Sequence, residues 1–348
     1  MEEKKLQPNQ NHSSEATLEF QVIGIGHPIV DVLAEVDEQH IVDHGLPKGA
    51  MTLVDSETAE KLYTSLNESV EVCGGSAANT MVGLASFGEK VAFIGKTADD
   101  QLGEIFVEDI SNSGVYFGVS SKRITREPGT GHCVIAITPD AQRTMATFLG
   151  AASTLAVEDI NSGLIASSSI CYLEGYLWDS SNGFEVIEHS IEVARSYNRK
   201  VAISLSDPFC VQRHQKRFFS LLERGLIDIA FCNEDESKML FPGKEQEEIF
   251  DSFSQLCPIT CITKGAQGSS IIAGSQLIHI PAITISEVID TTGAGDLYAS
   301  GFLFGIGTGK SLQLSGRLAA LAAGEVISHV GAHPVASLSE LATSEGLI

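Results

Sequence analysis

A short glycine-rich segment in the last quarter of the chain places a carboxylate beside uncovered backbone N–H groups. Residues 290–296 read Asp-Thr-Thr-Gly-Ala-Gly-Asp and stand directly before an apolar run at 297–305. The small residues Gly293, Ala294 and Gly295 leave their N–H groups open to a ligand. The helix expected after them points the positive end of its dipole at the same place. This pattern predicts a binding site for an anion.

Asp296 stands at the edge of this predicted anion site. Because a carboxylate repels a phosphate group, Asp296 does not suit a phosphate ligand. It suits a general base that takes the proton from an attacking alcohol while the N–H groups hold the group being transferred. For a bare Gly-x-Gly-Asp pattern the alternative is an ordinary loop with an Asp near a helix N-terminus, where Asp is favoured anyway.

Two segments together resemble a known family. Residues 290–296 resemble the C-terminal signature of the ribokinase-type (PfkB) carbohydrate and nucleoside kinases. Residues 73–80, Cys-Gly-Gly-Ser-Ala-Ala-Asn-Thr, resemble the Gly-Gly-x-x-x-Asn substrate segment of that family. The resemblance extends from about residue 21 to about residue 338. It implies an enzyme that uses ATP and Mg²⁺ to phosphorylate an alcohol group.

The order of apolar runs predicts an α/β fold. Strands and helices alternate through the second half of the chain, which favours a mostly parallel sheet with helices on both faces. A β-hairpin at 131–149 fits poorly into that sheet, so we place it in a small β lid formed by about residues 32–55 and 127–150. Residues 1–18 are expected to be a disordered tail, and residues 19–348 a ribokinase-like three-layer sandwich.

An acidic residue follows the first expected strand. Asp31 stands in an apolar context, where an unpaired carboxylate would be unfavourable. Hydrogen bonds from a pair of substrate hydroxyls would resolve this, although an Asp that caps a turn is the alternative. The resemblance gives this Asp the role of holding sugar or ribose hydroxyls, and it adds four further residues to the acceptor site: His27, Gly74, Gly75 and Asn79.

Two later motifs resemble the nucleotide-binding parts of the family. Asn233 and Glu236 match an Asn-x-x-Glu motif near the triphosphate, where Glu236 would reach Mg²⁺ through water. Taken alone, this acidic stretch is more typical of a solvated helix N-terminus. The second motif resembles the Thr-(Lys/Arg)-Gly-x-x-Gly nucleotide loop, although any tight turn favours two glycines; its residues are Thr263, Lys264, Gly265 and Gly268.

Two further roles follow from the resemblance. Arg143 stands in the hairpin, where a mobile guanidinium could swing onto the transferring phosphate. A solvent-exposed hairpin Arg is the alternative. The first Asp and second Thr of the C-terminal signature can line a potassium site beside the anion hole, which makes Asp290 and Thr292 candidate ligands for K⁺.

The segments at 26–31 and 46–51 resemble the adenosine kinase-like branch of the family more than its sugar kinases. We therefore expect phosphorylation of a nucleoside 5′-hydroxyl, adenosine to AMP, with a ribokinase- or fructokinase-type sugar kinase as the alternative. His27 departs from this branch, which usually carries Asn there. The aromatic side chains of Phe148, Tyr176 and Trp178 could stack on a purine or simply fill the core.

The composition of the chain limits the kinds of binding partner and the cellular location that we expect. The formal net charge of −23 disfavours nucleic acid and anionic membranes as partners. Seven scattered cysteines without zinc-site spacing predict reduced thiols and a cytoplasmic location. We expect small-molecule substrates and a monomer or a homodimer. Two other function classes are less favoured by the sequence. A nucleotide-binding scaffold protein without catalytic activity is disfavoured because the 293–296 segment is intact. An oxidoreductase with a Rossmann site is disfavoured because Ile29 stands where its Gly-x-Gly-x-x-Gly motif requires the third glycine.

Overall fold

The computed structural model describes residues 17–118, 128–140 and 142–348. In these residues the larger sheet has nine strands in the order β14-β13-β12-β11-β10-β9-β1-β5-β6. The pairs from β6 to β12 are parallel, and β13 and β14 are added antiparallel at one edge. The bounds are β1 Phe20–Ile25, β5 Val91–Ile94, β6 Val115–Phe117, β9 Ser168–Glu174, β10 Lys200–Ser204, β11 Ile229–Asn233, β12 Ile259–Thr263, β13 Ser269–Ala273 and β14 Gln276–Ile280.

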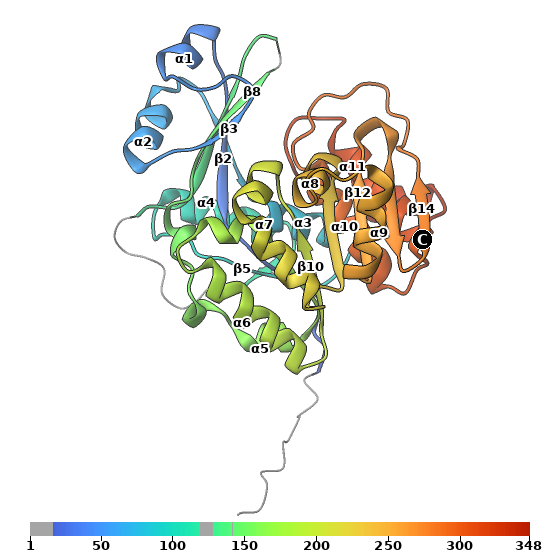
Figure 1. Ribbon diagram of the computed structural model, residues 1–348. Coiled ribbons are helices and arrows are strands. Elements are labelled where there is room, and N and C mark those ends of the chain that lie inside the picture. Colours follow the sequence, from blue (N-terminus) through green and yellow to red (C-terminus); the bar gives the residue numbers. More distant parts are fainter. Residues whose placement is uncertain (1–16, 119–127, 141) are drawn as a thin grey trace, which may run out of the picture.

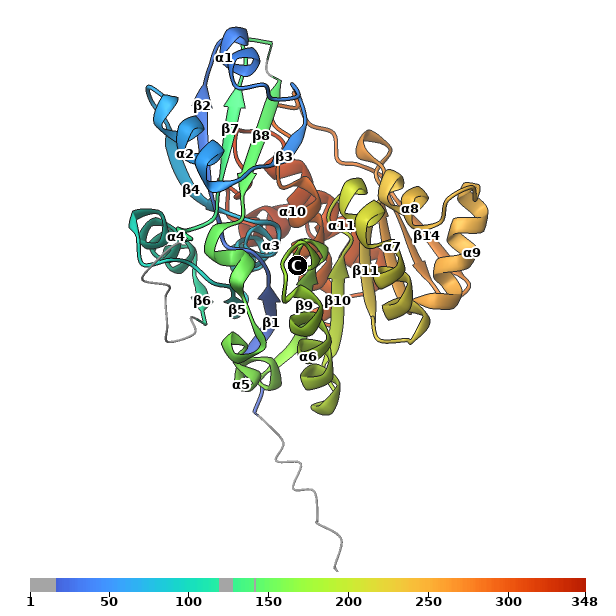
Figure 2. The same ribbon diagram turned by 60° about the vertical axis from the view of Figure 1, so that its left-hand side comes forward.

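Helices cover both faces of this sheet (Figures 1 and 2). Successive strand residues point to opposite faces. On β1, Val22 packs in one apolar cluster, and its neighbour Ile23 packs in the other. The first cluster holds α3 Ser76–Ser86, α4 Gln101–Asn112, α10 Ala294–Gly307, α11 Leu312–Val326 and α12 Leu338–Ser344. The second holds α5 Ser162–Ala166, α6 Gly183–Ser196, α7 Pro208–Glu223, α8 Glu234–Leu240 and α9 Gln246–Leu256. The predicted three-layer α/β fold is confirmed.

A second sheet rises from one end of the first (Figure 1). Its described strands have the order β3-β8-β7-β2-β4, with the bounds β2 Ile29–Glu35, β3 Met51–Leu53, β4 Val70–Gly74, β7 His132–Ile137 and β8 Arg143–Phe148. Strands β7 and β8 pair antiparallel, so the hairpin is present. Helix α2 Ser56–Ser65 packs on β7 and β8, and α1 Glu38–Asp43 follows β2.

The second sheet draws on the residues assigned to the lid and on β4, which the sequence did not place there. Its closure over a bound acceptor stays a prediction. Residues 1–16 of the expected disordered tail lie outside the described residues, as do residues 119–127 and 141. None of the helices in the described ranges combines the length and the apolar character that a bilayer span requires.

Candidate active site

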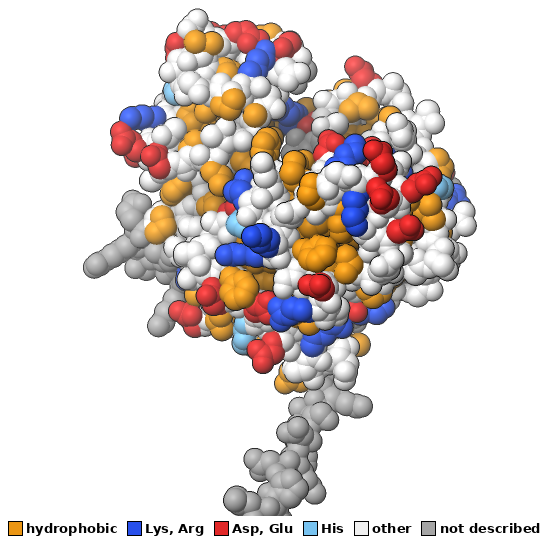
Figure 3. Space-filling view, viewed as in Figure 1, with side chains coloured by type: hydrophobic (Ala, Val, Ile, Leu, Met, Phe, Trp, Pro, Cys, Tyr) orange, Lys and Arg blue, Asp and Glu red, His pale blue; other side chains and the backbone are white. Residues whose placement is uncertain are grey.

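A cavity of about 820 Å³ lies where the two sheets meet. It opens at the carboxyl ends of the strands of the larger sheet, which is where ligands bind in open α/β sheets. Figure 3 shows the surface hollowed between the smaller sheet, at upper left, and the α8–α11 side of the molecule, at upper right. The start of α10 and the inner face of the smaller sheet complete the wall.

Asp296 lies in the first turn of α10 and lines this cavity. The residue before the helix, Gly293, has a φ of 76°, which glycine adopts without strain. The Asp296 carboxylate accepts hydrogen bonds from Ser76 Oγ at 2.7 Å and from Asn79 Nδ2 at 3.0 Å, both on α3. Burial raises the pKa of Asp296 to about 6, and these two hydrogen bonds oppose the rise. Asp296 is therefore ionised at pH 7 and basic enough to take a proton.

The three backbone N–H groups of the glycine segment differ in whether they donate a hydrogen bond within the protein. The Ala294 N–H donates to Thr291 O at 3.2 Å, so one of the three expected anion-hole donors already has a protein partner. In the described part of the chain no such partner is found for the N–H groups of Gly293 and Gly295. A Cβ built on Gly295 would meet no atom within 4 Å, because that position opens into free space. The anion hole is therefore reduced to two of its three expected donors in this arrangement.

Arg143 connects the smaller sheet to the glycine segment. Its Nη1 lies 2.6 Å from Asp290 Oδ2 and donates to Thr292 Oγ1 at 3.3 Å. The side chains of Arg143 and Asp290 are 15% and 0% exposed, so Arg143 is not the solvent-exposed hairpin residue of the alternative reading. Whether it reaches a phosphate stays a prediction.

The expected potassium ligands are occupied by protein donors. Asp290 Oδ1 accepts from the N–H and hydroxyl of Thr292, at 2.9 and 2.7 Å, and Asp290 Oδ2 accepts from Gly331 N at 2.7 Å. With Arg143 also on Oδ2, a guanidinium takes the place that a cation would take. The two side chains therefore do not fit K⁺ as arranged, in contrast to the expectation from the sequence.

Asp31 faces the cavity from β2 of the smaller sheet. Burial raises its pKa to about 7; the charges of Asp296 and Asp290 add to the rise, and Arg143 opposes it. A Cβ on Gly74 would come within 2.5 Å of the Asp31 carboxylate, so only glycine leaves room beside it. Gly75 has a φ of 96° and stands as the residue before α3. These contacts fit the predicted acceptor pocket.

Two residues expected at the acceptor line the cavity and also make contacts within the protein. The Asn79 amide is 5% exposed and is engaged by Asp296 and, through its Oδ1, by His333 Nε2 at 3.1 Å. The His27 ring is 2% exposed, and its Nε2 lies 2.7 Å from Ser180 Oγ. Burial lowers the pKa of His27 to about 4, so the ring is neutral. The structure therefore places Asn79 in the cavity wall beside Asp296, and its contact with an acceptor stays a prediction.

Glu174 is a cavity residue that sequence analysis missed. It ends β9 with 1% exposure and accepts hydrogen bonds from His27 N at 2.7 Å and Ala77 N at 2.8 Å. Burial raises its pKa to about 8, although both N–H groups oppose the rise. Through these two hydrogen bonds Glu174 links the residues after β1 to the first turn of α3, which carries Ser76 and Asn79. An acid at the end of an apolar strand was the available signal, as it was for Asp31.

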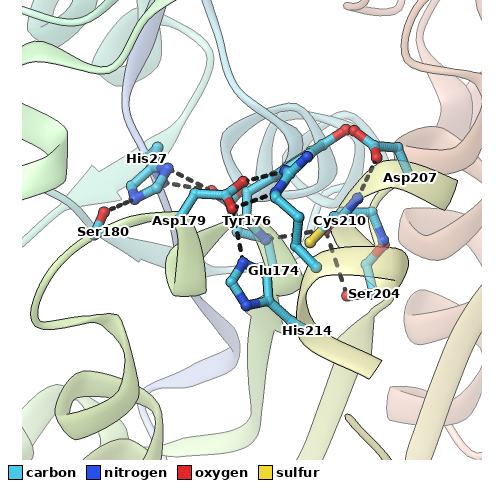
Figure 4. Close-up of polar contacts among 11 residues, drawn as sticks. His27, Glu174, Tyr176, Asp179, Ser180, Ser204, Asp207, Cys210 and His214 are labelled. Carbon is cyan, nitrogen blue, oxygen red and sulfur yellow. Dashed lines mark hydrogen bonds and ion pairs between the residues drawn. The ribbon is translucent and has the colours of Figure 1, made fainter. Parts of the chain in front are cut away.

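A network of polar side chains supports this wall of the cavity (Figure 4). Asp179 ends the 3₁₀ helix Gly175–Asp179 and is held by Arg213 Nη2 at 2.6 Å and His214 Nε2 at 2.7 Å, both on α7. Tyr176 lines the cavity and hydrogen-bonds Asp207. Trp178 packs edge-on against Phe218 with 4% exposure, so it belongs to the core. Phe148 packs edge-on against His132 and is absent from the described cavity wall.

Some residues of the two nucleotide motifs line the cavity, and the others lie in a turn outside its wall. Asn233 caps α8, donates to Glu236 Oε1 at 2.6 Å and accepts from Glu236 N at 2.8 Å. Glu236 also lines the cavity, and burial raises its pKa to about 7, so it is more than a solvated helix cap. Thr263 lines the cavity too. Lys264, Gly265 and Gly268 lie in the following turn, beyond the described lining residues, with Lys264 Nζ 5.0 Å from the Phe250 ring.

The described lining residues include no lysine or arginine. The acidic ones are Asp31, Glu174, Asp179, Asp207, Glu236 and Asp296. A triphosphate would be repelled by this wall unless a divalent cation came with it. Carboxylate oxygens are the ligands that Mg²⁺ prefers, and Glu236 supplies one carboxylate to the cavity wall. The described residues contain no group of three or more His, Cys, Asp or Glu side chains that could hold a metal, so Glu236 fits an ion that also keeps water and phosphate ligands.

Family comparison agrees with this fold and site. The model of the pfkB family carbohydrate kinases matches residues 53–337, and the chain belongs to that family. Kinases of the family use ATP, typically with Mg²⁺, so the protein is a phosphotransferase of this type.

Particular relatives include both nucleoside and sugar kinases. A probable sugar kinase protein from Rhizobium etli CFN 42 is 40% identical, with a TM-score of 0.90 over 95% of this chain and 100% of that one. An adenosine kinase from Sinorhizobium meliloti is 39% identical, with a TM-score of 0.88 over 94% and 99%. Adenosine kinase 1 of Arabidopsis thaliana is 25% identical over 89% of this chain and 94% of its own.

Proposed function

We propose that the protein transfers the γ-phosphate of ATP to the 5′-hydroxyl of a nucleoside, converting adenosine to AMP. The observation that carries this proposal is the position of Asp296. It sits in the first turn of α10, is held by two donors from α3, and shares the cavity with Asp31. A base beside a helix N-terminus can take a proton from an alcohol while nearby N–H groups stabilise the transferred group.

In this proposal Asp31 and Asp296 act at different points of the acceptor. Asp31, with Gly74 beside it, accepts hydrogen bonds from the two ribose hydroxyls. Asp296 receives the proton of the 5′-hydroxyl as its oxygen attacks phosphorus, and the bond from phosphorus to the ADP oxygen breaks. The N–H groups of Gly293 and Gly295 hold the transferring oxygens.

The remaining groups act on ATP. Glu236 would hold Mg²⁺ through water, and the ion would neutralise the phosphate charge when bound. Arg143 would leave Asp290 for the phosphates when the smaller sheet closes, because both groups compete for the same guanidinium. Thr263 contributes to the nucleotide side of the cavity, and Tyr176 provides aromatic surface within it. The Lys264–Gly268 turn would contact only a part of the nucleotide that extends beyond the cavity wall.

A sugar acceptor is the second candidate function, favoured by the relationship to the R. etli protein. An ADP-release assay with adenosine, guanosine, inosine, cytidine, ribose and fructose tests both candidates. We expect turnover of adenosine well above that of the free sugars. Preference for ribose or fructose would overturn the nucleoside proposal and leave the kinase assignment standing.

Two further expectations remain proposals. The seven cysteines are all free and buried, which supports a reducing, cytoplasmic environment. The described edge strands of the smaller sheet, β3 and β4, could pair with a second copy and form a homodimer. Size-exclusion chromatography with light scattering would distinguish a monomer from a dimer.

A further inference from the structure

A histidine far from the motifs contacts the candidate base through one amide. His333 Nε2 lies 3.1 Å from Asn79 Oδ1, and Asn79 Nδ2 lies 3.0 Å from Asp296 Oδ2. His333 follows α11 in the chain, whereas Asn79 belongs to α3. The three side chains therefore form one hydrogen-bonded series that ends at the carboxylate.

Hydrogen-bond chemistry fixes the direction of this series. An ionised carboxylate only accepts hydrogen bonds, so Asn79 must present its NH₂ group to Asp296. The Asn79 carbonyl oxygen then faces His333, and it too only accepts. His333 must therefore donate from Nε2, which defines its tautomer.

The surroundings of His333 keep its ring neutral. Burial lowers the pKa of His333 to about 4, opposed by the charge of Asp109 on α4. The other polar neighbour is Cys73 Sγ on β4, 3.8 Å from Nε2. A neutral imidazole donates from only one ring nitrogen, so its donor is available to Asn79 across the neutral pH range.

We propose that His333 is a positioning residue for the transfer reaction, because its Nε2–H holds the Asn79 amide with the NH₂ group toward Asp296. This inference rests on the proposed role of Asp296 as the base. The alternative amide orientation would turn the carbonyl oxygen of Asn79 toward Asp296. Only a protonated Asp296 can satisfy that orientation, and a protonated Asp296 cannot accept the proton of the alcohol.

Loss of His333 should therefore change the titration of Asp296. Without its partner the Asn79 amide can rotate, and the carboxylate then loses one donor that favours its charged form. The other titratable groups around Asp296 are unchanged, since His333 contacts none of them in the described structure. They are Asp31, Glu174 and Glu236, with the two tyrosines Tyr172 and Tyr176.

The test uses His333→Leu in the full-length enzyme. We expect the acid limb of the pH profile of kcat to move up by about 0.5–1 pH unit. From a pKa near 6, this shift lowers kcat by about 2- to 6-fold at pH 6 and by less than about 2-fold at pH 7. The KM of the acceptor should change by less than about 2-fold, because His333 does not face the acceptor pocket. His333→Gln, whose amide can donate, should return the limb toward its original position.

Two controls separate this role from general damage. His329 stands four residues away in the same segment and hydrogen-bonds Glu325, so His329→Leu should leave the profile unchanged. Asn79→Leu should shift the limb as His333→Leu does, and the double variant should shift it no further. An unmoved limb in His333→Leu, or an additive double variant, would overturn the proposal.

A second measurement does not depend on turnover. The ¹³C signal of the Asp296 carboxyl, assigned by its loss in Asp296→Asn, reports the titration directly. We expect a midpoint near pH 6 in the wild type and a higher one in His333→Leu. An equal midpoint in both proteins would refute the positioning role even if no acceptor is turned over. Absent turnover together with the expected shift would refute the proposed function alone.

Discussion

Replacing Asp31 by alanine is expected to weaken acceptor binding far more than ATP binding. Asp31 faces the cavity from the smaller sheet, and Gly74 leaves its carboxylate accessible. Hydrogen bonds to a charged group contribute about 1.5–3 kcal/mol, which corresponds to roughly a 10- to 150-fold rise in the acceptor KM. The KM of ATP should change little, because Asp31 is proposed to lie away from the triphosphate.

The same residue gives acceptor binding a pH dependence. Burial raises the pKa of Asp31 to about 7, so the carboxylate is charged above that pH and neutral below it. The acceptor KM of the wild type should therefore rise as the pH falls from 8 to 6. Asp31→Asn keeps the shape of the side chain without a titrating group, and its acceptor KM should stay level over that range.

Initial rates with adenosine and ATP varied independently, at pH 6, 7 and 8, measure both effects. The wild type should also use 2′-deoxyadenosine and 3′-deoxyadenosine poorly, because each lacks one of the paired hydroxyls. Asp31→Ala should discriminate less among the three nucleosides. Equal changes in the KM of acceptor and ATP would show that Asp31 has a structural role and would refute this reasoning.

Three further predictions concern the α10 end of the cavity. Asp296→Asn should fold normally and lose about 10²- to 10⁴-fold in kcat, as expected for loss of a general base, and retention of a tenth of the rate would exclude that role. Gly295→Val should leave the unfolding free energy nearly unchanged, because a Cβ at this position meets no protein atom within 4 Å. The same variant should raise the KM of ATP, and unchanged kinetics would show that the segment binds no phosphate. Arg143→Ala should lower the unfolding free energy in urea by about 3 kcal/mol, since it leaves the Asp290 carboxylate buried without its guanidinium, and Arg143→Lys should lower it less. A loss below about 0.5 kcal/mol in Arg143→Ala would place that pair among the weak surface ion pairs.

The sequence by itself determined the features that depend on neighbouring residues. The alternation of strands and helices, the β7–β8 hairpin and the glycine segment before α10 are each set by local periodicity and turn chemistry. Asp296 could be predicted as a site residue because it stands in the first turn of a helix whose N-terminus is marked by the glycine segment. Asp31 could be identified because a lone acid in an apolar stretch requires a partner.

Only the tertiary structure decided which distant side chains meet. Asn79 reaches Asp296 across 217 residues and His333 across 254, and neither pairing leaves a periodic signal in the chain. The contact of Arg143 with Asp290, and the Glu174 link between β1 and α3, likewise arise from the packing of elements remote in sequence. Local patterns specify the elements and their exposed groups, whereas the pairing of buried polar groups depends on how those elements pack, because each buried group must find its partner within the assembled fold.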